Sequence, residues 1–129
     1  MSYSVTTDLF ASKLDAIHSI DQSKKYNVVD LGNMAGSITI DLSVATEFTG
    51  VLTASTTIAF SNVPAANQSQ VVYLRLTNGG AFKVTWPTST KFAKATAPVF
   101  TDSGVDLIGI KYDSVTSTYM VFVIELDVR

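Results

Sequence analysis

The stretch of sequence that decides the fold reads SITIDL and covers residues 37–42. Its even positions from Ile38 to Leu42 are apolar, and Thr39 and Asp41 between them are polar. Because successive side chains of a β-strand point to opposite faces, this alternation predicts a strand with one buried and one exposed face. The period of two returns along most of the chain, so we expect an all-β domain.

Working outward from this stretch, we predict seven or eight strands separated by turn residues. They cover residues 26–31, 37–42, 47–54, 56–60, 70–77, 82–86, 105–113 and 118–128. The tripeptide Asn78-Gly79-Gly80 between two of these stretches indicates a hairpin, and residues 87–103 are expected to form a long crossover. Short strands with one long crossover predict an antiparallel β-sandwich of jelly-roll type.

The composition agrees with one β-rich domain. A chain of 129 residues usually forms a single core. It holds sixteen Thr, fifteen Val and eight Ile, and such β-branched side chains favour sheets. Charged residues make up 16%, whereas about 25% is typical of soluble domains. Since a free monomer normally keeps more surface charge, this low fraction indicates a protein that works in an assembly.

Several partners and chemistries are excluded by the same composition. The absence of cysteine excludes disulfides, thiolate zinc sites and a cysteine nucleophile, and fits synthesis in a reducing cytoplasm. Nine Lys plus Arg and a net charge of −2 give no cationic surface for nucleic acid. No stretch approaches the roughly 18 to 20 apolar residues of a membrane span, and the start of the sequence shows no secretory signal. We therefore expect no nucleic-acid or membrane partner.

Residues 1–25 differ in period from the β-domain, residues 26–129, and we interpret them as an N-terminal arm. Phe10, Leu14 and Ile17, hereafter the stripe, follow the i, i+4, i+7 spacing of one helical face. The spacing predicts a short amphipathic helix of about three turns. Because so short a helix is marginal alone in water, the stripe must dock on the protein's own sheet or on another chain.

The final predicted strand, residues 118–128, is apolar on both faces. Its odd positions from Tyr119 to Val123 share one face, and its even positions from Met120 to Val128 share the other. A strand of a sandwich normally turns one face to water, so this strand needs a second cover. That cover is either the N-terminal helix or a neighbouring subunit. We predict self-association through five residues of two strands: Val71, Tyr73, Tyr119, Val121 and Val123.

The sequence offers no catalytic constellation. His18 is the only histidine, and its place beside Ile17 on the predicted helix explains it without a catalytic role. No nucleophile elbow, P-loop or dinucleotide fingerprint occurs. Asp106 is an even position and Asp113 an odd position of one predicted strand, so their side chains would point to opposite faces. We therefore interpret them as solvated carboxylates that do not form a pair. Calcium ligation or acid–base chemistry is the minor alternative. We predict no catalytic, cofactor-binding or metal-binding residue and no enzymatic activity.

Short motifs follow one another in a fixed order over about three quarters of the chain. They are residues 39–42, the paired-threonine stretch 56–64, residues 72–77, Thr85-Trp86-Pro87, Lys91-Phe92, Thr96-Ala97-Pro98, residues 104–107, Tyr112-Asp113 and Thr118-Tyr119. In this order they resemble a β-domain of tailed-bacteriophage virion proteins, of the tail-fibre and head-decoration type. Phe92 and Tyr119 stand where that family often has Trp.

The resemblance implies a structural role on a phage particle, usually as a homotrimer, after synthesis in the cytoplasm of the bacterial host. The short chain favours a capsid decoration or cement protein that binds the major capsid protein or another virion protein. The stripe of Phe10, Leu14 and Ile17 is the predicted particle attachment. The alternative is a tail-fibre or adhesin module that recognises host-surface carbohydrate, with Trp86, Tyr112 and Tyr119 as a stacking platform.

Overall fold

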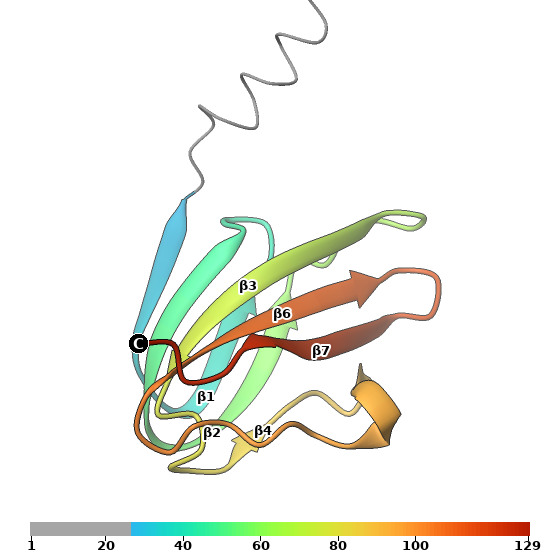
Figure 1. Cartoon of the computed structure of the whole chain (residues 1–129). Coiled ribbons are helices and arrows are strands. Elements are labelled where there is room, and N and C mark those ends of the chain that lie inside the picture. The colour runs from blue at the N-terminus through green and yellow to red at the C-terminus, as the bar shows by residue number, and fades with distance from the viewer. Residues whose placement is uncertain (1–26) are drawn as a thin grey trace, which may run out of the picture.

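The computed structural model describes residues 27–129, and these fold into strands that curl into two layers (Figure 1). The elements are β1 (Val28–Asp41), β2 (Glu47–Ser61), β3 (Ser69–Thr77), β4 (Val84–Thr85), β5 (Thr90–Lys91), the 3-10 turn η1 (Ala93–Ala95), β6 (Val105–Asp113) and β7 (Thr118–Glu125). None of the described residues lies in an α-helix. The all-β prediction is confirmed, whereas the predicted N-terminal helix lies outside the described residues.

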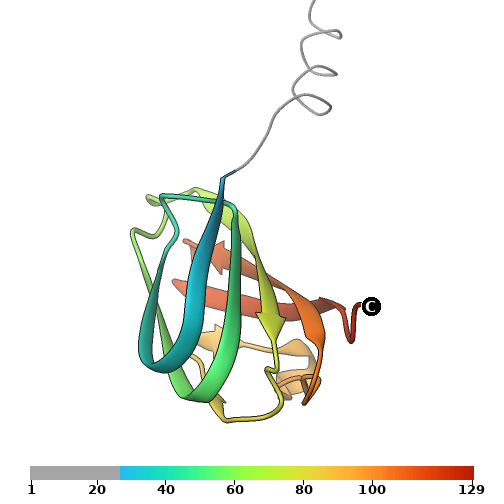
Figure 2. The same ribbon diagram turned by 90° about the vertical axis from the view of Figure 1, so that its left-hand side faces the viewer.

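β1 and β2 are each bent into two arms. Val28 at the start of β1 pairs with Glu47, and Asp41 at its end pairs with Ser61, so the two strands run parallel over their whole length. Residues 42–46 alone connect them and span at most about 20 Å, whereas a straight strand of 14 residues would be roughly 46 Å long. Each strand therefore doubles back, as Figure 2 shows.

The bend of β1 depends on glycine. The register of β1 against β2 shifts between Asp30 and Asn33 and again between Met34 and Gly36. Gly32 and Gly36 have positive φ angles of 66° and 71°, a left-handed conformation that glycine adopts without a steric penalty. The Gly32 amide also donates a 2.8 Å hydrogen bond to the carboxylate of Asp30.

We expect Gly36→Ala to lower the free energy of unfolding by about 1 kcal/mol, because alanine is strained at a positive φ. An added Cβ would meet no atom within 4 Å, so the loss would report backbone strain alone. Urea denaturation measures it, with the exposed neighbour Ser37→Ala as control. Equal stability of the two variants would contradict a left-handed residue at this bend.

The sheet is mixed. Its strand order is β1-β2-β3-β6-β7-β5, and β4 pairs with β2. β3 runs parallel to the first arm of β2, whereas β6 is antiparallel to both β3 and β7. The prediction of an antiparallel sandwich is therefore wrong for β1, β2 and β3, and a jelly roll is not confirmed. A period of two reports which side chains share a face and carries no information on strand direction.

The corner at Asn78-Gly79-Gly80 is not the predicted hairpin. β4 pairs with the second arm of β2, through Thr56 with Val84 and Thr57 with Thr85. Residues 78–83 therefore carry the chain from one layer to the other. β1 (Val28–Asp41) covers most of the predicted strands 26–31 and 37–42 as its two arms, and the predicted strands 47–54 and 56–60 are the two arms of β2.

The core lies between the two layers. Its fully buried side chains come from both arms of β1 and β2 and from the inward-facing positions of β3 and β6; the largest are Met34, Ile40, Phe48, Leu52, Ile58, Leu74, Leu76, Ile108 and Ile110. Even-numbered residues of β3 and β6 face this core, and odd-numbered residues face away from it. The outward side of β1, β2, β3, β6 and β7 is called the outer face below.

Candidate functional site

A row of paired residues crosses the outer face over five strands. Strand register aligns Val28 of β1, Glu47 of β2, Tyr73 of β3, Gly109 of β6 and Phe122 of β7. Residues aligned in this way lie about 4.8 Å apart from strand to strand. The row therefore brings apolar groups from opposite ends of the sequence onto one continuous surface.

The β7 side of this surface forms a ridge, which we define as Met120, Phe122 and Ile124. All three side chains are between 40% and 46% exposed. The Phe122 ring lies against the backbone of β6, because it occupies the space that a Cβ at position 109 would need. Glycine at position 109 thus allows the Phe122 ring to cover β6, while the outer side of the ring stays exposed to solvent.

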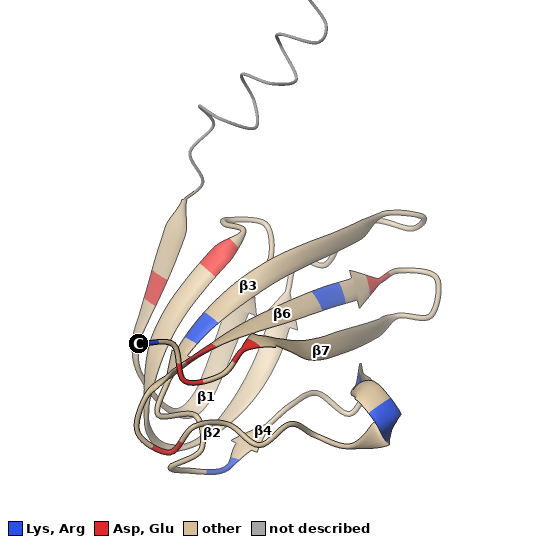
Figure 3. Cartoon of the chain, in the orientation of Figure 1, with Lys and Arg blue, Asp and Glu red and all other residues tan. Residues whose placement is uncertain are grey.

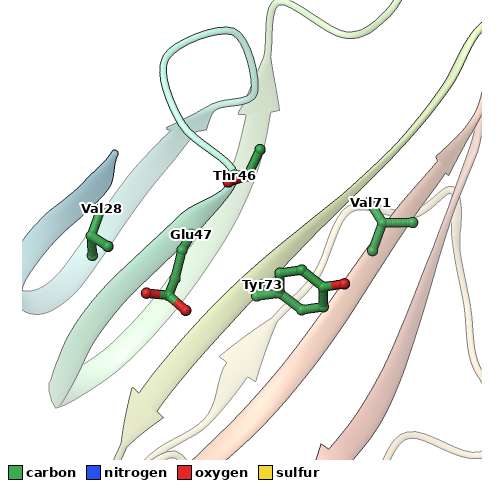
Figure 4. A pocket seen from close by; sticks show the side chains of 5 residues that line it. All are labelled: Val28, Thr46, Glu47, Val71 and Tyr73. Carbon is green, nitrogen blue, oxygen red and sulfur yellow. The ribbon is translucent and has the colours of Figure 1, made fainter. Parts of the chain in front are cut away.

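The β1 side of the same surface is hollowed. Val28, Thr46, Glu47, Val71 and Tyr73 line a hollow of about 520 Å³ (Figure 4). Its apolar walls are the side chains of Val28, Val71 and Tyr73, which remain between 37% and 52% exposed. We refer to these five residues as the hollow. The ridge and the hollow together leave a large part of the outer face apolar and uncovered within residues 27–129.

Charged residues of both signs lie on the same five strands, some of them between the apolar groups (Figure 3). Arg75 and Lys111 lie on β3 and β6, and Asp30, Glu47 and Glu125 lie on β1, β2 and β7. In the register, Lys111 stands between Val71 and Met120. Lys111 therefore separates the hollow from the ridge at this level of the sheet.

The structure divides the predicted self-association residues between two faces. Val71 and Tyr73 lie on the outer face, where they line the hollow. Val121 is only 2% exposed in the core, and Tyr119 and Val123 pack against that core. The predicted grouping of these five residues on one surface is therefore wrong. Both faces of β7 are apolar, so the sequence could not show which one points inward.

The aromatic residues proposed as a sugar platform are also separated. Tyr119 stacks on Phe60 with ring centroids 4.6 Å apart and lies 5.1 Å from the ring of Tyr112. Burial, with a smaller contribution from Tyr112, raises the pKa of the Tyr119 phenol above its usual value. Trp86 instead packs edge-on against Phe100 at 6.5 Å. Tyr112 and Tyr119 thus belong to an internal cluster rather than to one surface with Trp86.

Asp106 is not the solvated carboxylate that the sequence suggested. Its side chain is fully buried and accepts hydrogen bonds from the amide of Thr101 at 2.7 Å, the hydroxyl of Thr101 at 2.6 Å and the amide of Asp127 at 2.9 Å. The carboxylate thereby ties the loop before β6 to the C-terminal segment after β7. Asp106 occupies an even position of its strand, like the apolar residues Ile108 and Ile110. This alternation was the sequence signal that Asp106 faces the core.

The stripe of Phe10, Leu14 and Ile17 lies outside the described residues, so its attachment role stays a prediction. Within residues 27–129, no three His, Cys, Asp or Glu side chains are grouped to hold a metal ion. Over the same range, no helix has the length and apolar character needed to cross a bilayer. No protein-family model, curated protein or solved structure matches this chain.

Proposed function

We propose that this chain is a structural protein of a bacteriophage virion, a capsid decoration or cement protein that binds the particle surface as a homotrimer. The observation that carries the proposal is the uncovered apolar ridge on β7, in a chain with few charged residues. The order of motifs from residue 39 onward supports the assignment to phage. The proposal includes no catalytic step, no cofactor and no nucleic-acid partner.

In this proposal the ridge joins the subunits to one another. Contiguous apolar surface in soluble proteins marks sites of association, and a closed symmetric assembly uses the same contact several times. Attachment at several points then makes weak individual contacts strong in sum. The major capsid protein or another virion protein is the proposed second partner.

The proposal is tested on purified particles of a phage that encodes this chain. Quantitative mass spectrometry of the virion is expected to find the protein in many copies, in proportion to the lattice sites of the capsid. A handful of copies would instead place it on the tail. Absence from purified virions would overturn the proposal.

A groove beside the corner of residues 78–83 favours carbohydrate recognition as a second candidate function. Phe82, Trp86, Pro98 and Val99 help to line a groove of about 220 Å³, and Phe82 is 44% exposed. Exposed aromatic faces bind sugar rings through stacking. Titration of Trp86 fluorescence with host polysaccharide is expected to give a saturable shift that Phe82→Ala abolishes. An unchanged spectrum would contradict this candidate.

A further inference from the structure

The hollow lies beside the start of β1, directly after residues 1–26 in the sequence. Val28, which forms one wall of the hollow, is the first residue of β1. The residues just before it therefore start at the rim of the hollow. The twenty-six residues before Asn27 include the stripe of Phe10, Leu14 and Ile17, which needs an apolar surface to cover it.

The linker is long enough for the stripe to reach the hollow. Seven residues, 21–27, separate the predicted helix from Val28, and an extended chain of that length spans about 25 Å. The hollow extends from β1 across β2 to β3, a width of two strand spacings or about 10 Å. The linker thus has slack to turn back and lay the helix over these strands.

The side chains of the segment match those of the hollow. The apolar stripe can contact Val28, Val71 and Tyr73, and a cation on the same segment can pair with Glu47, which forms no ion pair within residues 27–129. Lys13 precedes Ile17 by four residues, so on a helix it borders the stripe. One segment therefore carries apolar groups for the walls of the hollow and a positive charge for Glu47.

We propose that residues 9–20 pack in the hollow of their own chain, with Phe10, Leu14 and Ile17 on its apolar walls and Lys13 paired with Glu47. A tethered segment meets its own surface at an effective concentration in the mM range, well above that of a segment from another copy at ordinary protein concentrations. The ridge on β7 stays uncovered in this arrangement. The inference therefore goes beyond the proposed function, and it gives the stripe a contact within the chain in place of the predicted particle attachment.

Disulfide trapping in the full chain tests this contact. The protein has no cysteine, so no native thiol competes with the introduced pair. The variant with Leu14→Cys and Val71→Cys is expected to form an intramolecular disulfide in oxidised glutathione. It should do so at least about tenfold faster than a control with Ser12→Cys and Val71→Cys, because the tether raises the local thiol concentration only where the geometry permits contact. Ser12 lies on the opposite side of the predicted helix, so its thiol would point away from the hollow.

The product identifies the occupant of the hollow. A monomer that migrates faster without reductant supports the inference, and a disulfide-linked dimer would show that another copy fills the hollow and would overturn it. Equal rates for the two variants would also overturn it. Each of these outcomes leaves the particle test of the proposed function unaffected.

A charge exchange tests the pairing of Lys13 with Glu47. Glu47→Lys in the trapping variant is expected to slow disulfide formation severalfold, because two lysines would then face each other. Adding Lys13→Glu should restore the rate, since opposite charges meet again. A rate unchanged by Glu47→Lys would contradict the pairing.

Discussion

Asp106→Ala is expected to lower the free energy of unfolding by about 3 kcal/mol, because three hydrogen-bond donors in a partly buried site lose their acceptor at about 1 kcal/mol or more each. These donors are the amide and hydroxyl of Thr101 and the amide of Asp127. With their acceptor gone, the loop before β6 and the C-terminal segment lose their common anchor. A loss of this size removes a large share of the 5–15 kcal/mol that is usual for a folded domain.

Urea denaturation followed by circular dichroism measures the effect. Asp106→Asn should lose less stability than Asp106→Ala, because the amide oxygen still accepts hydrogen bonds. Asp102→Ala is the matched control, since that side chain is exposed in the same loop. If Asp106→Ala unfolded at the same urea concentration as Asp102→Ala, the carboxylate would have no anchoring role.

Two neighbouring substitutions on β7 are expected to have opposite consequences. Val121→Asp should prevent folding, because it places an unpaired charge among fully buried side chains and removes packing, a combined loss above about 4 kcal/mol. Phe122→Asp should leave the fold intact, because its side chain is 40% exposed. The same substitution should disrupt the ridge and release monomers.

Circular dichroism reports the fold and sedimentation velocity reports the assembly in both variants. Val99→Asp is the control for loss of an exposed apolar group, since Val99 is 85% exposed and lies outside the strands. It should change neither property. A folded Val121→Asp together with an unfolded Phe122→Asp would show that the inward and outward faces of β7 have been exchanged.

The positions of most strands could be predicted from the sequence because burial of one face enforces alternation. Residues 37–42 and 70–77 show this directly: residues 37–41 end β1, and residues 70–77 lie within β3. Strand direction could not be predicted in the same way. The parallel pairing of β1 with β2 depends on the bends near Gly32 and Gly36, and isolated glycines in a strand do not specify a reversal of the chain.

The candidate site was predicted in part. The two-sided apolar character of residues 118–128 indicated an interface, but the assignment of its faces depends on how β7 pairs with β6. Ile110 pairs with Val121 and Gly109 pairs with Phe122. Because paired residues share a face of the sheet, the inward position of Ile110 places Val121 inward and Phe122 outward. Asp106 was missed although its even position matches that of the buried Ile108 and Ile110, because no sequence pattern showed that donors from residues 101 and 127 would satisfy a buried carboxylate.

Sedimentation equilibrium on the purified protein, residues 1–129, tests the role of the ridge most directly, with a variant carrying Met120→Asp and Ile124→Asp beside it. We predict a trimer for the unmodified protein and a folded monomer for the variant, with matching circular dichroism spectra. A monomeric unmodified protein at concentrations well above those expected in an infected cell, or a variant that remains trimeric, would contradict the account.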